Sequence, residues 1–189
     1  MSLSVVIGPM FSGKSTRILQ LVSRYASIDT PCVVIKPRID NRYDPSLVVT
    51  HDRGTTPCIV SDRLMDIYPQ LLNEAQVIIV EEAQFFPDLL SFVTHQVYSE
   101  EKRVYVVGLS GDADCRPFGQ ILECIPMADE VDMLKALCRR CANGNAAPFT
   151  YRKTGRPEQQ VLIGGPDQYE ALCRACYVRA GLDGLVYLS

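Results

Sequence analysis

The sequence GPMFSGKS, from Gly8 to Ser15, restricts how the beginning of this chain can fold. It has the spacing G-x-x-x-x-G-K-S and directly follows the apolar, β-branched segment 3–7. That segment predicts a buried strand, and the apolar residues recurring after Ser15 predict a helix. Glycines let backbone N–H groups turn inward around an anion, and the positive end of the helix favours the anion. We therefore expect a strand, a phosphate-binding loop and a helix in succession.

This loop predicts a nucleoside triphosphate ligand, and we expect ATP with Mg²⁺. In loops of this spacing the lysine, here Lys14, reaches the β- and γ-phosphates, and the next hydroxyl, from Ser15, coordinates Mg²⁺. An ordinary glycine-rich turn is the alternative, but the pattern is complete and stands between a strand and a helix. The predicted nucleotide-binding residues of the loop are Gly8, Pro9, Met10, Phe11, Ser12, Gly13, Lys14, Ser15 and Thr16.

Strand-like and helix-like segments alternate along the chain before residue 134. Runs of β-branched apolar residues predict strands, and apolar residues at helical spacing predict helices between them. Such alternation is typical of an α/β fold with a parallel sheet and helices on both faces. The predicted strands are 5–7, 32–36, 77–80 and 104–109; the predicted helices follow Lys14 and cover about 64–72 and 87–98.

The character of the chain changes near residue 134. Before it, the polar segment 37–57 is long for a plain connection and predicts either a functional loop or a small hairpin. After it come paired cysteines, an NGNAAP loop and the run QVLIGG, which predicts a short strand. A chain of 189 residues fits one domain with a small appendage. We expect a nucleotide-binding domain over residues 1–133 and a small lobe over residues 134–189.

Charge and hydropathy argue against several classes of protein. The net charge of −3 disfavours a broad nucleic-acid-binding surface, which is usually basic. No apolar run is long enough to span a bilayer. The beginning of the sequence lacks the basic and apolar segments of a signal peptide. We expect a cytoplasmic protein that binds neither membranes nor nucleic acid.

Two carboxylates close the apolar run of VIIVEEAQFF. An apolar strand that ends in an acidic residue is the usual companion of a phosphate loop, because its carboxylate lies near Mg²⁺. Adjacent strand residues point to opposite sides, so Glu81 and Glu82 could do different work, one toward the metal and one toward the acceptor. A general base must reach the hydroxyl whose proton it removes. The alternative is two solvated charges at a strand end.

Two Cys-x-x-Cys pairs predict a metal site in the second lobe. Cys138 and Cys141 form one pair, Cys173 and Cys176 form the other, and 31 residues separate the two pairs. Four thiolates are a ligand set for tetrahedral Zn²⁺ and leave no open position, so the zinc would be structural. A redox-active pair is the alternative. We expect the remaining cysteines to be small buried apolar residues; they are Cys32, Cys58, Cys115 and Cys124.

Six motifs, taken in order, resemble the type II thymidine kinases, the cytosolic and poxvirus-like class. They are GPMFSGKST, THDRG, EEAQFF, RPFGQIL, the paired cysteine motifs and IGGPDQY, and they cover nearly the whole chain. The resemblance implies a RecA-like α/β domain and a zinc-bearing lobe whose lasso loop closes over the nucleoside. It also implies ATP-dependent phosphorylation of thymidine at the 5′-hydroxyl, in deoxynucleotide salvage, and a homo-oligomer, commonly a tetramer.

On the phosphate side, the resemblance assigns roles to four charged residues. Glu82 matches the general base that takes the proton of the 5′-hydroxyl. Glu81 stands where the family usually has Asp, so it would hold the Mg²⁺ shell with a longer arm. Asp52 and Arg53 of THDRG match a loop that approaches the metal and the phosphates.

On the nucleoside side, the resemblance implies an apolar pocket closed by the lasso. Thr150 matches a position beside the thymine methyl, Arg152 a phosphate-side arginine, and Tyr169 a tyrosine near the sugar. Backbone groups of residues 162–164 would bind the edge of the base, since a buried edge without partners costs about 2–7 kcal/mol per group. The implied nucleoside-binding residues are Met10, Phe85, Leu109, Phe118, Phe149, Thr150, Arg152, Leu162, Ile163, Gly164 and Tyr169.

Two residues depart from the family's pattern. Ser110 stands where an Asp is usual, and Ala113 replaces a Phe of the pocket. Loss of that ring would enlarge the pocket. We hypothesise that the chain accepts bulkier or altered pyrimidines, such as deoxyuridine analogues.

Two other function classes stay open from the sequence. One is a nucleotide-dependent switch or ATPase whose zinc lobe binds a partner, which would have little affinity for free nucleosides. The other is a zinc-ribbon nucleic-acid module, but the arginines around the cysteine pairs are too few to outweigh the net charge. Those arginines are Arg139, Arg140, Arg174 and Arg179.

Overall fold

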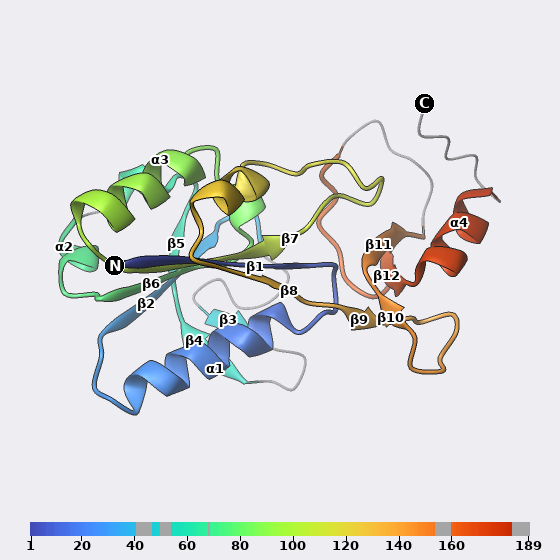
Figure 1. Cartoon of the computed structure of the whole chain (residues 1–189), viewed down its shortest axis with the longest axis horizontal. Coiled ribbons are helices and arrows are strands. Elements are labelled where there is room, and N and C mark those ends of the chain that lie inside the picture. Colours follow the sequence, from blue (N-terminus) through green and yellow to red (C-terminus); the bar gives the residue numbers. More distant parts are fainter. Residues whose placement is uncertain (41–46, 50–53, 68, 154–159, 183–189) are drawn as a thin grey trace.

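A computed structural model describes residues 1–40, 47–49, 54–67, 69–153 and 160–182. Its centre is a six-stranded sheet in the order β5-β2-β6-β7-β1-β8 (Figure 1). Every pairing between neighbouring strands of this sheet is parallel, as the alternation of segments predicts. The strands are β1 Ser2–Gly8, β2 Cys32–Pro37, β5 Ile59–Ser61, β6 Val77–Val80, β7 Arg103–Leu109 and β8 Glu130–Met133.

Helices cover both faces of the sheet, which confirms the α/β prediction. In Figure 1, α1 (Lys14–Ala26) lies on one side of the strands and α3 (Leu89–Thr94) on the other. Each face has its own apolar core, because successive strand residues point to opposite sides. The core under α1 contains Val6, Ile18, Leu21 and Ile79, and the core under α3 contains Val5, Ile78, Leu89 and Phe92.

The predicted helix over 64–72 is wrong as one element. The segment forms a 3₁₀ turn at Leu64–Asp66 and a short helix α2 at Pro69–Asn73. Proline is favoured at the first position of a helix, which explains why α2 begins at Pro69.

Two strands of the central sheet escape the sequence prediction. They are β5, which is very short, and β8, whose apolar and acidic residues alternate.

The predicted helix over 87–98 is observed as α3 followed by a π-helical turn at His95–Ser99. A further 3₁₀ segment covers Ile121–Met127. Among the described residues, no helix combines the length and the apolar character that crossing a bilayer requires.

The polar segment 37–57 contains a small hairpin, which is one of the two alternatives predicted for it. β3 (Leu47–Val49) pairs antiparallel with β4 (Thr55–Pro57). The buried ammonium group of Lys36, in β2, donates a hydrogen bond to the Leu47 carbonyl oxygen at 2.9 Å. The hairpin is therefore tied to the carboxyl edge of the central sheet.

The described residues after Met133 form two small antiparallel sheets and a helix. β9 (Ala136–Leu137) pairs with β10 (Ala146–Ala147), and β11 (Phe149–Arg152) pairs with β12 (Tyr169–Leu172). Helix α4 (Arg174–Leu182) follows. Their own small core contains Ala136, Cys138, Ala147, Leu172 and Ala180.

The strand predicted for QVLIGG is wrong. Residues 160–165 have no strand geometry, and β12 begins only at Tyr169. Side chains fix the segment instead. Gln160 Nε2 donates to Asp112 Oδ2 at 2.8 Å, and the Tyr169 hydroxyl donates to the Leu162 carbonyl at 2.7 Å. The segment therefore borders a cavity rather than a sheet edge.

Candidate active site

The phosphate loop joins the carboxyl end of β1 to the beginning of α1 (Figure 1). Gly13, the residue before α1, has a φ of 84°, a conformation that side chains disfavour. A Cβ at Gly8 would lie 2.7 Å from both the Leu134 carbonyl oxygen and Ser12 Oγ. The backbone conformation of Gly13 and the close contacts around Gly8 thus both favour glycine, which explains the place of the two glycines in the motif.

Hydrogen bonds fix the direction of two polar side chains of the loop. Lys14 Nζ donates to the carbonyl oxygens of Gly8 at 3.3 Å and Pro9 at 2.8 Å. Ser15 Oγ donates to Glu81 Oε1 at 2.7 Å, which joins the loop to the end of β6. Hydroxyl and carboxylate oxygens are the ligands that Mg²⁺ prefers, so Ser15 and Glu81 fit that ion.

A cavity of about 320 Å³ lies over the loop. Two residues that the sequence reasoning missed, Lys36 and Asp40, contribute to its wall. Lys36 ends a parallel strand, a position that could have signalled a ligand site. Asp52 and Arg53 lie outside the described residues. The predicted residues that line this cavity are Met10, Phe11, Ser12, Gly13, Lys14, Ser15, Thr16, Glu81 and Glu82.

A second, smaller cavity of about 50 Å³ is lined by residues from both parts of the chain. It shares Met10 and Glu82 with the first cavity, so these two residues stand where the cavities meet. Of the eleven residues predicted to bind a nucleoside, ten line this cavity: Met10, Phe85, Leu109, Phe118, Thr150, Arg152, Leu162, Ile163, Gly164 and Tyr169.

Glu82 has an unusual backbone conformation for a residue with a side chain. Its φ is 46° and its ψ is 43°, in the left-handed region, just after β6. Strained backbone of this kind costs about 1–3 kcal/mol and clusters at functional sites. The turn brings Glu82 to both cavities, whereas Glu81 points to Ser15. The two carboxylates therefore face different groups, as their adjacency predicts.

The walls of the second cavity are held by rings and hydrogen bonds. The rings of Phe85 and Phe118 meet edge to face, with centroids 5.2 Å apart. Thr150 Oγ1 accepts a hydrogen bond from the Met10 backbone N–H at 3.0 Å, which ties β11 to the phosphate loop. Arg152 donates to the Tyr169 hydroxyl at 2.9 Å. The apolar and polar sides of the cavity are thus both fixed in position.

Phe149 is the predicted nucleoside-binding residue that lines neither cavity. Its ring packs on Tyr177, with centroids 5.0 Å apart, and the Arg174 guanidinium lies 4.7 Å from its centroid. The reason is strand geometry: Thr150 faces the cavity, so the adjacent Phe149 faces away. Ala113 does line the cavity, and its carbonyl accepts a hydrogen bond from the Tyr177 hydroxyl at 2.7 Å.

Three polar residues of the second cavity escaped the sequence reasoning. Asp112 and Gln160 line the cavity, and a hydrogen bond joins their side chains. Gln84 also lines this cavity, and its Nε2 donates a hydrogen bond to Glu82 Oε2 at 2.7 Å. Gln84 was visible in the EEAQFF motif, but nothing in the sequence shows which way a glutamine side chain points.

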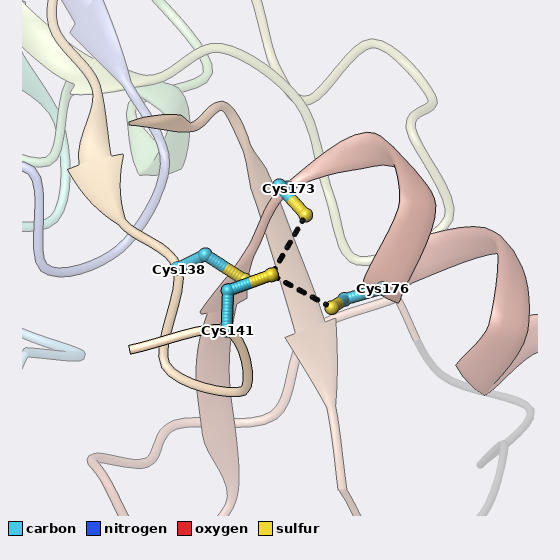
Figure 2. A group of neighbouring side chains, drawn as sticks. All are labelled: Cys138, Cys141, Cys173 and Cys176. Atoms are coloured by element: carbon cyan, nitrogen blue, oxygen red, sulfur yellow. Dashed lines mark hydrogen bonds between the residues drawn. The ribbon is translucent and has the colours of Figure 1, made fainter. Parts of the chain in front are cut away.

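The four predicted metal-binding cysteines form one cluster (Figure 2). The sulfurs of Cys138, Cys141, Cys173 and Cys176 all lie within 4.8 Å of one another. Cys141 Sγ is 3.6 Å from Cys173 Sγ and 3.4 Å from Cys176 Sγ, the contacts marked by dashed lines. Two pairs from distant segments therefore converge as a tetrahedral thiolate site requires.

The thiol of Cys138 has a lowered pKa. Burial raises the pKa of its thiol, but hydrogen bonds from the backbone N–H groups of Cys173 and Cys141 outweigh burial and lower the pKa to about 6. A thiolate is the form that binds metal. The cluster fits a structural metal ion.

The expectation that the other four cysteines are buried is confirmed for Cys124 and wrong for the exposed Cys115, while Cys32 and Cys58 are half-buried. Burial raises the pKa of the thiols of Cys32 and Cys124 to about 11, which makes them poorly reactive. Cys115 is exposed, in a loop where its φ is 61°.

Comparisons with known proteins agree with this geometry. The family model described as Thymidine kinase matches residues 1–177. The chain is 39% identical over 175 residues to "Thymidine kinase, cytosolic" of Gallus gallus, covering 93% of this chain and 76% of that protein. It is 38% identical over 176 residues to "Thymidine kinase" of Vaccinia virus (strain Ankara), covering 93% of this chain and 96% of that protein.

A third relative, "Thymidine kinase, cytosolic" of Homo sapiens, is 38% identical over 177 residues, covering 94% of this chain and 73% of that protein. These matches span the phosphate loop, both cavities and the cysteine cluster. The chain belongs to the thymidine kinase family.

Proposed function

We propose that this protein transfers the γ-phosphoryl group of ATP to the 5′-hydroxyl of thymidine, giving the 5′-monophosphate for deoxynucleotide salvage. The observation that carries the proposal is the position of Glu82, which borders both the phosphate-loop cavity and the second cavity. A carboxylate at that junction can accept a proton from a hydroxyl presented by one ligand to a phosphate of the other.

In the proposed mechanism, this chain supplies positioning and charge. The loop backbone and Lys14 bind the phosphates, and Glu82 takes the proton of the attacking 5′-hydroxyl. Ser15 and Glu81 would hold Mg²⁺, which, when bound, neutralises charge on the phosphate oxygens. The strained turn at Glu82 favours this arrangement, since it directs adjacent carboxylates to different groups.

The second cavity is proposed to bind the pyrimidine nucleoside. Phe85 and Phe118 would hold the faces of the base, and the backbone of residues 162–164 would bind its edge. Its small volume disfavours a purine. Hydrogen bonds to the edge discriminate thymine from cytosine far more strongly than a methyl contact does. Because Ala113 has a small side chain in this wall, we propose that deoxyuridine and its analogues are also substrates.

The architecture is proposed to be a RecA-like phosphate-loop domain over residues 1–133 followed by a zinc-binding lobe over residues 134–189. Support comes from the separate apolar cores on the two sides of this boundary. Zn²⁺ would be held by the four cysteines and would add folding free energy to the lobe. The segment between the cysteine pairs would act as the nucleoside-covering lasso.

We also propose a cytoplasmic homo-oligomer, a dimer or tetramer. In the described part of the chain β8 pairs with β1 alone, and Val131 and Met133 on β8 are exposed. An exposed strand edge with apolar side chains favours pairing with another chain. Size-exclusion chromatography with light scattering tests this proposal; a monomer at micromolar concentration would contradict it.

A steady-state assay with ATP, Mg²⁺ and a panel of nucleosides tests the function. We expect phosphorylation of thymidine and deoxyuridine, and no phosphorylation of purine nucleosides. ATP hydrolysis that needs a protein partner, without nucleoside phosphorylation, would instead favour a nucleotide-dependent switch. A gel shift with nucleic acid at moderate salt tests the zinc-ribbon alternative, and we expect no shift.

A further inference from the structure

Gln84 is a buried polar residue that the proposed reaction does not use directly. It is 3% exposed and lies two residues after Glu82, in the turn that follows β6. Burying an amide is unfavourable unless its donor and acceptor groups find partners. Both ends of the Gln84 amide do so, and one partner is the carboxylate of Glu82.

The orientation of the Gln84 amide is fixed by its acceptor end. Gln84 Oε1 accepts a hydrogen bond from the Leu109 backbone N–H, at the end of β7, at 3.1 Å. An N–H group cannot accept that bond, so the amide cannot be reversed. Nε2 must therefore face Glu82, and it lies 2.7 Å from Glu82 Oε2.

The surrounding backbone leaves Gln84 no room to move. Gly108, in β7, has no side chain, and a Cβ there would collide with Gln84 Oε1. Gly119 has a φ of 59°, and a Cβ there would collide with the backbone of Gln84. Two glycines from different elements thus allow the chain to close tightly around this residue.

We propose that Gln84 is a positioning residue for the carboxylate of Glu82. Its N–H group holds Oε2, so that the carboxylate stays directed toward the junction of the two cavities. The inference rests on the proposed function, in which Glu82 is the general base. The strained backbone of Glu82 strengthens the case, because such a conformation persists only where neighbouring groups hold it.

Other charged groups line the two cavities that Glu82 borders. The carboxylates are Glu81, Asp40 and Asp112, and the cations are Lys14, Lys36 and Arg152. None of them is altered in the variants below. A change in kcat that follows a change at residue 84 alone therefore reports on Gln84.

Gln84→Glu is the sharpest variant. It keeps an oxygen that can accept from the Leu109 N–H but places a second carboxyl beside Glu82. A like charge repels the Glu82 carboxylate from the position that Gln84 holds, so we expect kcat for thymidine to fall by about tenfold. The KM values for thymidine and ATP should stay within about twofold.

Gln84→Met has a similar length but no hydrogen-bonding groups, and we expect a smaller fall in kcat with the same unchanged KM values. Gln120→Met is the matched control. Gln120 Oε1 also accepts a hydrogen bond from a backbone N–H, that of Leu90 at 3.0 Å, and Gln120 lies outside both cavities. Its kcat should match that of the unsubstituted chain. Thermal unfolding and zinc content show which variants are folded.

A structural measurement that needs no catalysis separates this proposal from the proposed function. The position of the Glu82 carboxylate is determined in crystal structures of the unsubstituted chain and of Gln84→Met. A carboxylate that leaves the junction of the two cavities in Gln84→Met supports the proposal even if the chain phosphorylates no nucleoside. An unmoved carboxylate in folded Gln84→Met, or a kcat of both Gln84 variants equal to that of the control, overturns it.

Discussion

The sheet region and the residues after Met133 are stabilised in different ways. The sheet is sandwiched between two apolar cores, with large side chains such as Ile79 and Phe92 fully buried. After Met133 the strands have two to four residues, and the core contains mainly small side chains and cysteines. Apolar burial can stabilise the first region, whereas the second needs the metal site to supplement its small core.

The two regions also make different parts of the site. The phosphate side is built mainly by the sheet region, from the loop after β1 and the carboxylates after β6, with Gly165 and Pro166 of the other region in its wall. The second cavity takes Thr150, Arg152 and Tyr169 from the other region. Nucleoside binding should therefore depend on the metal more strongly than ATP binding does. The predictions below test this difference.

The largest effect is expected from Cys138→Ser. Binding of zinc to structural sites contributes about 10–16 kcal/mol to folding, and this change removes a buried member of the cluster whose pKa is lowered to about 6. We expect loss of zinc, a raised KM for thymidine by at least about tenfold, and a smaller loss of ATP affinity. Metal analysis and equilibrium ATP binding measure these quantities.

Cys115→Ser is the matched control for that change, because Cys115 is exposed and lies outside the cluster. It should retain one zinc ion per chain. One tightly bound zinc per chain in Cys138→Ser would contradict the assignment of all four cysteines as ligands.

Glu82→Gln should have the next largest effect. It should slow the chemical step without weakening substrate binding. Removal of a general base lowers kcat by about 10²–10⁴-fold. Equilibrium dialysis should show that binding of ATP and thymidine is retained. Glu130→Gln, an exposed change on β8, should leave kcat unaltered. A fall in kcat below about threefold would remove Glu82 from the role of base.

Phe92→Ala tests whether apolar burial stabilises the sheet region independently of the metal. Phe92 is 1% exposed, and truncation of a buried Phe costs about 3–5 kcal/mol of unfolding free energy. Urea unfolding with and without a chelator measures the cost. The loss should be the same in both conditions, because the metal lies in the other region. A cost that disappears on chelation would show that the two regions unfold as one unit.

The smallest effect is expected at the link between the regions. Thr150→Val preserves shape but removes the acceptor for the Met10 N–H. A hydrogen bond of this kind contributes about 0.5–1.5 kcal/mol, so the KM for thymidine should rise by about two- to tenfold with little change in kcat. Thr150→Ser, which keeps the hydroxyl, should restore most of the affinity. Equal KM values for the valine and serine variants would exclude the bond from nucleoside binding.

Local patterns in the sequence were sufficient to predict the sheet core and the phosphate loop. Runs such as 77–80 are apolar throughout, and all four of their residues are buried. The spacing of Gly8 and Gly13 reflects steric needs of the loop that the structure makes explicit. β8 could not be predicted this way, because an edge strand buries little and its sequence shows no continuous apolar run.

The site was predicted less fully where geometry is set by distant contacts. The run QVLIGG has the composition of a strand, but Gln160 and Leu162 are held by Asp112 and Tyr169. Resemblance alone placed Phe149 in the pocket, whereas strand alternation turns it away. The direction of the Gln84 amide depends on a backbone N–H 25 residues away.

The place of β1 in the sheet has a consequence for biosynthesis. β1 lies between β7 and β8, and Ser4 is paired with Tyr105 on one side and Glu130 on the other. On the ribosome, the phosphate loop therefore emerges long before the strands that complete the sheet beside it. Such distant pairings slow folding and leave apolar surface exposed in the nascent chain. We expect the folding yield of this protein to depend strongly on chaperones during synthesis.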